Sequence, residues 1–248
     1  MGEKAERVTA VRPAFYAARP GRARDWWTIL HPPYTAWHMS YVVIGATLAP
    51  SIDGGRLVAT LLAFFLAVGI AAHALDELHG RPLHTGIPGG VLVSAAAISL
   101  GGALALGGAG IGRVGVGLLV FMVVGPVLVV GYNVELFGGR LHSDAGFALA
   151  WGAFPVLTAY YVQAQRLDLT ALLAATAAFS LSIAQRSLST RARAVRRQAE
   201  HVEGAMTRRD GTVQSIDEEW LLRPIERALR AMSVTMVALA LALVAARV

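Results

Sequence analysis

Long stretches without a single charged side chain dominate this sequence and restrict what it can fold into. Seven of them occupy residues 26–52, 57–75, 82–112, 114–134, 145–165, 169–185 and 231–246. The hydrocarbon core of a bilayer is about 30 Å thick, and a helix needs about 20 apolar residues to cross it. We therefore predict an all-α integral membrane protein with about seven transmembrane helices. We expect these helices near 34–50, 57–78, 88–110, 113–134, 145–164, 168–188 and 228–247.

The composition excludes several classes of protein. Hydrophobic residues make up 55% of the chain and charged residues only 15%, whereas a soluble chain carries about 25% charged residues. The absence of cysteine excludes disulfides, iron–sulfur clusters, thiolate zinc sites and cysteine nucleophiles. The net charge of +6 raises the question of nucleic acid. No basic–aromatic interleaving accompanies it, so we expect no nucleic-acid partner.

The basic residues predict how the chain is oriented. With the N-terminus in the cytoplasm, 18 of the 22 Lys and Arg residues lie inside, and only Arg56, Arg113, Arg166 and Arg247 lie outside. This asymmetry is typical of the positive-inside rule in a multi-pass protein of the inner or plasma membrane. We expect a cytoplasmic or interfacial segment at 1–30, with no signal peptide, and a transmembrane helical domain at 31–248. That domain includes a cytoplasmic loop at 189–227.

The end of the second predicted helix carries the strongest candidate for chemistry. His73, Asp76 and Glu77 are three and four residues apart, which predicts that they share one face of the helix. Ionisable groups at such a place usually face the bundle interior or a water-filled cavity. Two carboxylates beside an imidazole could hold a divalent cation, and oxygen ligands favour magnesium. Alternatively, the acids meet only lipid headgroups and Arg81.

Two other helices carry polar stripes. Tyr132 and Glu135 share a face at the end of the fourth helix, where Asn133 adds a buried amide. His38 lies on a polar–aromatic stripe of the first helix. For these residues both ligand binding and simple packing remain open. Asp144 is expected to cap the fifth helix.

The segment after the sixth helix is strongly basic in its first half. Arg186, Arg193 and Arg197 lie there, and arginines of this kind could bind a diphosphate. They could equally anchor the chain on anionic lipid, because the predicted topology alone requires basic residues at this position.

This layout resembles the UbiA superfamily of intramembrane prenyltransferases over roughly residues 30–190. The similarity lies in His31-Pro32-Pro33 through Gly45, in the stretch from Ala72 to Arg81-Pro82, and in the region from Tyr132 to Pro155. The chain also departs from the family pattern. Of the first Asp-rich motif only Asp76 remains, residues 185–199 contain no acid where the second motif belongs, and the family has nine helices.

The resemblance implies a protein that acts on an isoprenoid lipid, with prenyl transfer from a prenyl diphosphate at the cytoplasmic face. Asp76 and Glu77 would then hold Mg²⁺, and His73 would be a ligand or base. The expected substrate-binding residues are His38, Arg81, Tyr132, Asn133, Glu135, Arg186, Arg193 and Arg197. The lost aspartates favour a non-catalytic alternative, a lipid- or quinone-binding protein or a scaffold of a membrane complex. A redox or metal protein that uses its histidines is a third possibility.

Overall fold

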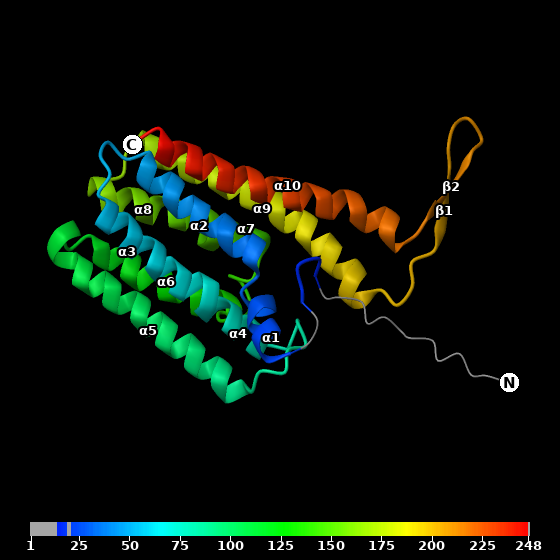
Figure 1. The fold of residues 1–248 in the computed structure, drawn as a ribbon, viewed down its shortest axis with the longest axis horizontal. Coiled ribbons are helices and arrows are strands. Elements are labelled where there is room, and N and C mark those ends of the chain that lie inside the picture. Colours follow the sequence, from blue (N-terminus) through cyan, green and yellow to red (C-terminus); the bar gives the residue numbers. More distant parts are fainter. Residues whose placement is uncertain (1–13, 19–20, 248) are drawn as a thin grey trace.

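The computed structural model describes residues 14–18 and 21–247. These residues form an elongated helical bundle from one end of which a two-stranded hairpin projects (Figure 1). We call this the hairpin end. In chain order the elements are α1 Arg22–Ile29, α2 Pro32–Thr47, α3 Gly54–Phe64, the π-helical η1 Phe65–Ala72, α4 His73–Leu78, α5 Gly89–Val114, α6 Leu118–Asn133, α7 Asp144–Ala148, the π-helical η2 Leu149–Ala153, α8 Phe154–Ala164, α9 Leu169–Gln198, β1 Gly204–Thr207, β2 Val213–Ile216 and α10 Glu218–Ala245.

A helix lies at each of the seven places where the sequence predicts one, and the all-α prediction is thus confirmed. Five helical stretches in the described chain are long and apolar enough to cross a membrane: Gly54–Leu78, Gly89–Val114, Asp144–Ala164, Leu169–Gln198 and Glu218–Ala245. The remaining two helices, α2 and α6, have 16 residues each. Crossing by all seven therefore stays a prediction.

Large apolar side chains are exposed on the outer surface of the bundle. Ile98 on α5 is 74% exposed and Val120 on α6 is 62% exposed. On α10 the exposed face changes along the helix from arginines, the last of which is Arg230, to Val234 and Leu241. Exposed apolar surface on this scale is typical of contact with lipid. The change on α10 indicates where that contact begins.

Close packing of α2 against α8 holds the middle of the bundle together. A Cβ atom on Gly45 would lie 2.4 Å from the carbonyl oxygen of Val156, so the two backbones touch at this point. Trp37 and Tyr41 of α2 are buried beside it with Val156. Small residues at helix crossings allow such an approach in membrane proteins.

Two π-helical turns interrupt the long apolar helices, and the sequence does not predict either. Their carbonyl oxygens are used by histidines: Gly69 of η1 accepts from Nδ1 of His73 at 3.0 Å, and Trp151 of η2 accepts from Nδ1 of His38 at 2.9 Å. π-helical turns occur mostly as single insertions in α-helices, often near functional sites. Here both lie beside the polar pocket described below.

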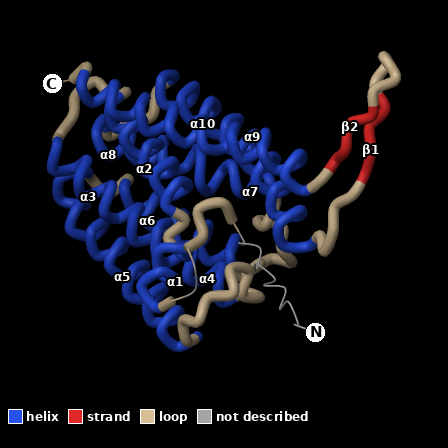
Figure 2. Tube along the Cα trace, turned by 45° about the vertical axis from the view of Figure 1, so that its right-hand side comes forward, coloured by secondary structure: helices blue, strands red, loops and turns tan. Residues whose placement is uncertain are grey.

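The predicted loop at 189–227 is largely ordered secondary structure. α9 continues to Gln198 and α10 begins at Glu218, where the side chain of Asp217 caps it by accepting from the amide of Trp220 at 2.7 Å. Between them β1 and β2 pair antiparallel, and the hairpin points away from the bundle in both views (Figures 1 and 2). The sequence reading ended α9 at the membrane boundary, but nothing in the following residues breaks a helix.

Helix caps correct one further prediction. Ser143, not Asp144, is the cap of α7, and its Oγ accepts from the amide of Gly146 at 3.1 Å. Asp144 is the first residue of the helix, where a carboxylate favours the positive end of the helix dipole.

Candidate functional site

Most of the candidate residues meet in one cavity at the hairpin end, which we call the polar pocket. Its volume is about 250 Å³. It receives side chains from α2, η1, α4, α6, η2 and α9. The predicted residues that line it are His38, His73, Asp76, Tyr132, Asn133, Arg186, Arg193 and Arg197. The sequence spacing thus identified groups that the fold brings together from four separate helices.

Arginines of α9 supply the positive charge of the polar pocket. Arg186, Arg193 and Arg197 recur at intervals of seven and four residues and therefore follow one face of the helix. Nε of Arg186 lies 3.3 Å from Oδ1 of Asp144. Nη2 of Arg193 donates to Oγ1 of Thr190 at 3.0 Å. Guanidinium groups in this arrangement suit the oxygens of a phosphate.

Histidines on the other helices present hydrogen-bond acceptors to the pocket. A carbonyl oxygen can only accept, so Nδ1 of His38 and Nδ1 of His73 both carry the hydrogen in their bonds to Trp151 and Gly69. Each neutral ring then has its lone pair on Nε2. Asp76 is the carboxylate among the residues that line the pocket.

Tyr132 brings an unsatisfied hydroxyl into the pocket. Its side chain is only 5% exposed, and its hydroxyl has no hydrogen-bond partner in the described structure. The ring stacks on His142, with centroids 4.6 Å apart. A buried hydroxyl is normally hydrogen-bonded, so this atom is placed to meet a ligand. The neighbouring Asn133 donates to the carbonyl oxygen of Val129 at 2.7 Å.

Glu77 lies outside the polar pocket, contrary to the shared face that its spacing predicts. It is 0% exposed, and its carboxylate accepts from the amides of Leu83 and Thr85 at 3.0 and 2.9 Å and from the Thr85 hydroxyl at 2.8 Å. We therefore assign it to holding the loop after α4 rather than to sharing a metal ion with Asp76.

Arg81 and Glu135 are also absent from the lining of the polar pocket. Nη1 of Arg81 donates to the carbonyl oxygen of Ile87 at 2.6 Å and so closes the same loop that Glu77 holds. Glu135 has an exposed side chain, and its Oε1 lies 3.9 Å from Nε2 of His79 and 3.8 Å from Nδ1 of His142. Neither position supports direct contact with a ligand in the pocket.

The donor set for a metal ion is small. Within residues 14–18 and 21–247, no group of three or more His, Asp or Glu side chains is placed to hold one. Magnesium in phosphate sites is commonly bound by one or two carboxylates together with the phosphates of the substrate. The residues present fit only that mode, with Asp76 as the protein ligand.

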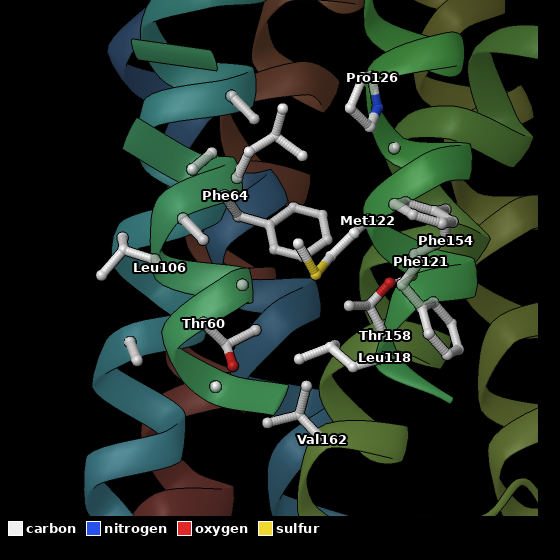
Figure 3. Close-up of a pocket in the computed structure, with 18 of the residues that line it drawn as sticks. Thr60, Phe64, Leu106, Leu118, Phe121, Met122, Pro126, Phe154, Thr158 and Val162 are labelled. Atoms are coloured by element: carbon white, nitrogen blue, oxygen red, sulfur yellow. Dashed lines mark hydrogen bonds between the residues drawn. The ribbon is translucent and has the colours of Figure 1, made fainter. Parts of the chain in front are cut away.

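A second cavity, the apolar pocket, lies between α3, η1, α5, α6 and α8. Its volume is about 320 Å³. In Figure 3 the side chains of Phe64 and Met122 point toward one another across it, and Phe154 and Val162 line it from α8. Val68 and Trp151 line both this pocket and the polar pocket. The two cavities therefore adjoin one another.

The sequence reading missed several residues of the polar pocket. Among them are His31, Phe147, Gln185 and Ser189. The signal for His31 was present, since an ionisable side chain directly precedes Pro32-Pro33 at the start of a helix. No protein-family model matches the chain, and no curated protein or solved structure matches it either.

Proposed function

We propose that this protein binds an isoprenoid lipid that carries a phosphate or diphosphate headgroup. The observation that carries the proposal is the adjacency of the two pockets through Val68 and Trp151. The polar pocket offers arginines to an anionic headgroup, and the apolar pocket offers an apolar surface to a prenyl chain. An amphipathic ligand that spans both would satisfy each with the matching half of the molecule.

With this function we propose a UbiA-like bundle in the cell membrane. It would have seven spans, with the N-terminus inside. The excess of Lys and Arg at the hairpin end supports an inward orientation. The change from Arg230 to Val234 on the exposed face of α10 supports a membrane boundary between them. The polar pocket would then open toward the cytoplasm, where soluble prenyl diphosphates are available.

As chemistry we propose prenyl transfer. The bond between the prenyl carbon and the diphosphate oxygen breaks, the acceptor forms a bond to that carbon, and the acceptor loses a proton. Arg186, Arg193 and Arg197 would stabilise the leaving diphosphate, and Nε2 of His73, whose Nδ1 donates to Gly69, would take the proton. Magnesium held by Asp76 and the phosphates would add further charge neutralisation.

A non-catalytic lipid- or quinone-binding protein is the second candidate. A specific observation favours it: within the part of the chain that the structure describes, Asp76 is the only carboxylate that lines the polar pocket. Binding of a headgroup by arginines requires no second carboxylate, whereas departure of a diphosphate depends strongly on neutralisation of its charge.

Binding of labelled geranylgeranyl diphosphate to the detergent-purified protein, with magnesium and with EDTA, tests these proposals. Tight binding that disappears with EDTA supports the magnesium-assisted reaction, and an acceptor screen should follow. Equal binding in both conditions supports the non-catalytic candidate. If the ligand does not bind in either condition, the lipid proposal is wrong.

Arginine variants locate the headgroup. We expect the double variant Arg193→Ala with Arg197→Ala to weaken binding at least tenfold, because charged hydrogen bonds contribute about 1.5–3 kcal/mol each. Arg208→Ala with Arg209→Ala is the matched control, since these arginines lie in the exposed hairpin connection. Equal loss in both double variants would indicate a nonspecific charge effect.

A substitution that fills the apolar pocket with a large side chain tests whether the prenyl chain of the ligand lies there. Ala103 on α5 lines this pocket, whereas Ala105 on the same helix is exposed and does not line it. We expect Ala103→Phe to weaken binding of geranylgeranyl diphosphate but not of inorganic pyrophosphate. Ala105→Phe should change neither. If Ala103→Phe binds geranylgeranyl diphosphate with unchanged affinity, the prenyl chain lies outside the apolar pocket.

A further inference from the structure

His31 occupies an unusual position at the edge of the polar pocket. It precedes α2 with a φ of 46°, a left-handed conformation that non-glycine residues rarely adopt. It lines the pocket, and its Nε2 is buried without a hydrogen-bond partner in the described structure. Strained backbone of this kind persists only where the surroundings hold it, often at ligand sites.

Tyr16 determines which nitrogen of His31 carries the hydrogen. Its hydroxyl lies 2.8 Å from Nδ1 of His31. A phenol that donates to an imidazole lone pair satisfies both buried atoms, whereas the reverse bond would leave the phenol hydrogen without an acceptor. Burial, reinforced by His73, holds the pKa of His31 well below its usual value, so the ring is neutral. Its Nε2 therefore carries the hydrogen.

The segment that presents Tyr16 is docked on α1 and α10, and the ring of Tyr16 also packs against Tyr34 of α2, with centroids 5.6 Å apart. Ala17 is buried, and the amide of Ala18 donates to Oγ1 of Thr28 in α1 at 3.1 Å. The guanidinium carbon of Arg230 in α10 lies 4.8 Å from the ring centroid of Phe15. These contacts fix the hydroxyl of Tyr16 against His31 from outside the pocket.

A second contact fixes the plane of the imidazole. The rings of His31 and His73 stack with centroids 4.4 Å apart and an interplanar angle of 9°. Because the rings are nearly parallel, the ring edge of His31, and with it Nε2, does not point at the His73 ring. His31 thus has the opposite tautomer to His38 and His73 and is a donor where they are acceptors.

We propose that Nε2–H of His31, held in this tautomer by Tyr16, and the hydroxyl of Tyr132 donate together to the phosphate oxygens of the ligand. These are the two buried polar side-chain atoms without a partner in the described chain, and both belong to the same pocket. This proposal rests on the proposed function in one respect, namely that the ligand carries a phosphate group. The two neutral donors would orient the phosphate group, while the arginines of α9 would supply the positive charge that attracts it.

Inorganic pyrophosphate, added to the full-length protein in detergent, is the probe that separates this proposal from lipid binding. With ¹⁵N-labelled histidine, we expect His31 to show a protonated Nε2 before addition and a shift of that resonance on binding. A resonance that shows protonated Nδ1, or one that does not move when pyrophosphate binds, overturns the proposal. Absence of pyrophosphate binding overturns it as well. This readout needs no variant beyond those that assign the resonance.

Tyr16→Phe tests the role of the phenol. The substitution removes one hydroxyl group, so that His31 is no longer held in one tautomer. We expect the Kd for pyrophosphate to rise about tenfold, which corresponds to the contribution of roughly one hydrogen bond. Tyr161→Phe is the matched control, because Tyr161 packs on Phe121 at the opposite end of α8, away from the polar pocket. Equal Kd values for Tyr16→Phe and the parent contradict the assignment.

The two proposals fail in different ways. If pyrophosphate shifts His31 but geranylgeranyl diphosphate binds no more tightly, the anion site stands and the lipid proposal falls. If geranylgeranyl diphosphate binds tightly and the His31 resonance stays in place, the lipid proposal stands and the role of His31 falls.

Discussion

Nδ1 of His38 donates to the carbonyl oxygen of Trp151 at 2.9 Å and so ties α2 to the π-helical turn η2 across the wall of the polar pocket. Removing the imidazole takes away the side-chain donor to a buried carbonyl and opens space beside Trp151. We expect His38→Ala to destabilise the fold by about 2–4 kcal/mol. Thermal unfolding in detergent measures this, with His79→Ala as the exposed control. Similar melting temperatures for the two variants would show that the bond contributes little.

Two adjacent acids should behave oppositely. Asp76 lines the polar pocket, whereas Glu77 holds the loop after α4 with three hydrogen bonds. We expect Asp76→Asn to abolish the magnesium dependence of ligand binding with little change in melting temperature. We expect Glu77→Gln to cost about 1–3 kcal/mol of stability, because a buried charged acceptor loses its bonds, and to expose the loop to protease.

The outcome is informative in either direction. If Asp76→Asn binds the ligand with unchanged magnesium dependence, Asp76 is not the metal ligand. If Glu77→Gln instead removes the magnesium dependence while the loop stays protected, our reassignment of Glu77 is wrong.

The crossing of α2 and α8 predicts a difference between two glycines. At Gly45 an added methyl group meets the backbone of Val156, whereas at Gly112 on α5 nothing lies within 4 Å. Gly45→Ala should therefore destabilise the bundle by about 1–3 kcal/mol. Gly112→Ala should be neutral or stabilising, because alanine favours a helix by about 1 kcal/mol over glycine. Unfolding in detergent compares them directly, and equal stabilities would contradict the close contact.

Asp168 gives the protein an acid-sensitive helix start. Its carboxylate accepts from the Tyr160 hydroxyl at 2.6 Å and from the amide of Thr170 at 3.0 Å, and these bonds hold its pKa below the usual value. A lowered pKa in the folded state means stabilisation that is present above about pH 4, the unfolded value, and lost as pH falls through the folded value.

The parent and Asp168→Asn should therefore differ most in melting temperature at neutral pH and converge below about pH 4. A gap that persists unchanged in acid would indicate that the asparagine disturbs the helix start by its shape and not by its charge.

The sequence predicted the helices because crossing a membrane imposes a simple demand on length and charge. The charge-free runs determine where α5 lies and where α9 begins, and His73, Asp76 and Tyr132 stand at the ends of other runs and meet in one pocket. Side chains at helix ends near one membrane face must gather there, whatever the order of the helices. This is why a pattern without any contact information identified most of the candidate site.

The errors have a different origin. Glu77 follows Asp76 directly, and only the path of the loop beyond it, which returns to Leu83 and Thr85, decides its role. The helical continuation of α9 past the expected boundary carries no hydropathy signal at all. Tyr16 and His31 are 15 positions apart, with α1 between them, and meet through the path of the chain around that helix. Such tertiary contacts do not follow from periodicity.

The π-helical turn η1 makes the length of its helix part of the site. A π-helix carries more residues per turn than the 3.6 of an α-helix. If the same eight residues of Phe65–Ala72 formed a regular α-helix instead, all that follows would be rotated by roughly 100° about the helix axis, the angle of one residue. His73 and Asp76 would then point away from the arginines, although the stretch would stay as apolar as before. Two chains with indistinguishable hydropathy could thus differ in whether they possess the pocket, and the difference would lie only in the hydrogen-bond pattern of this turn.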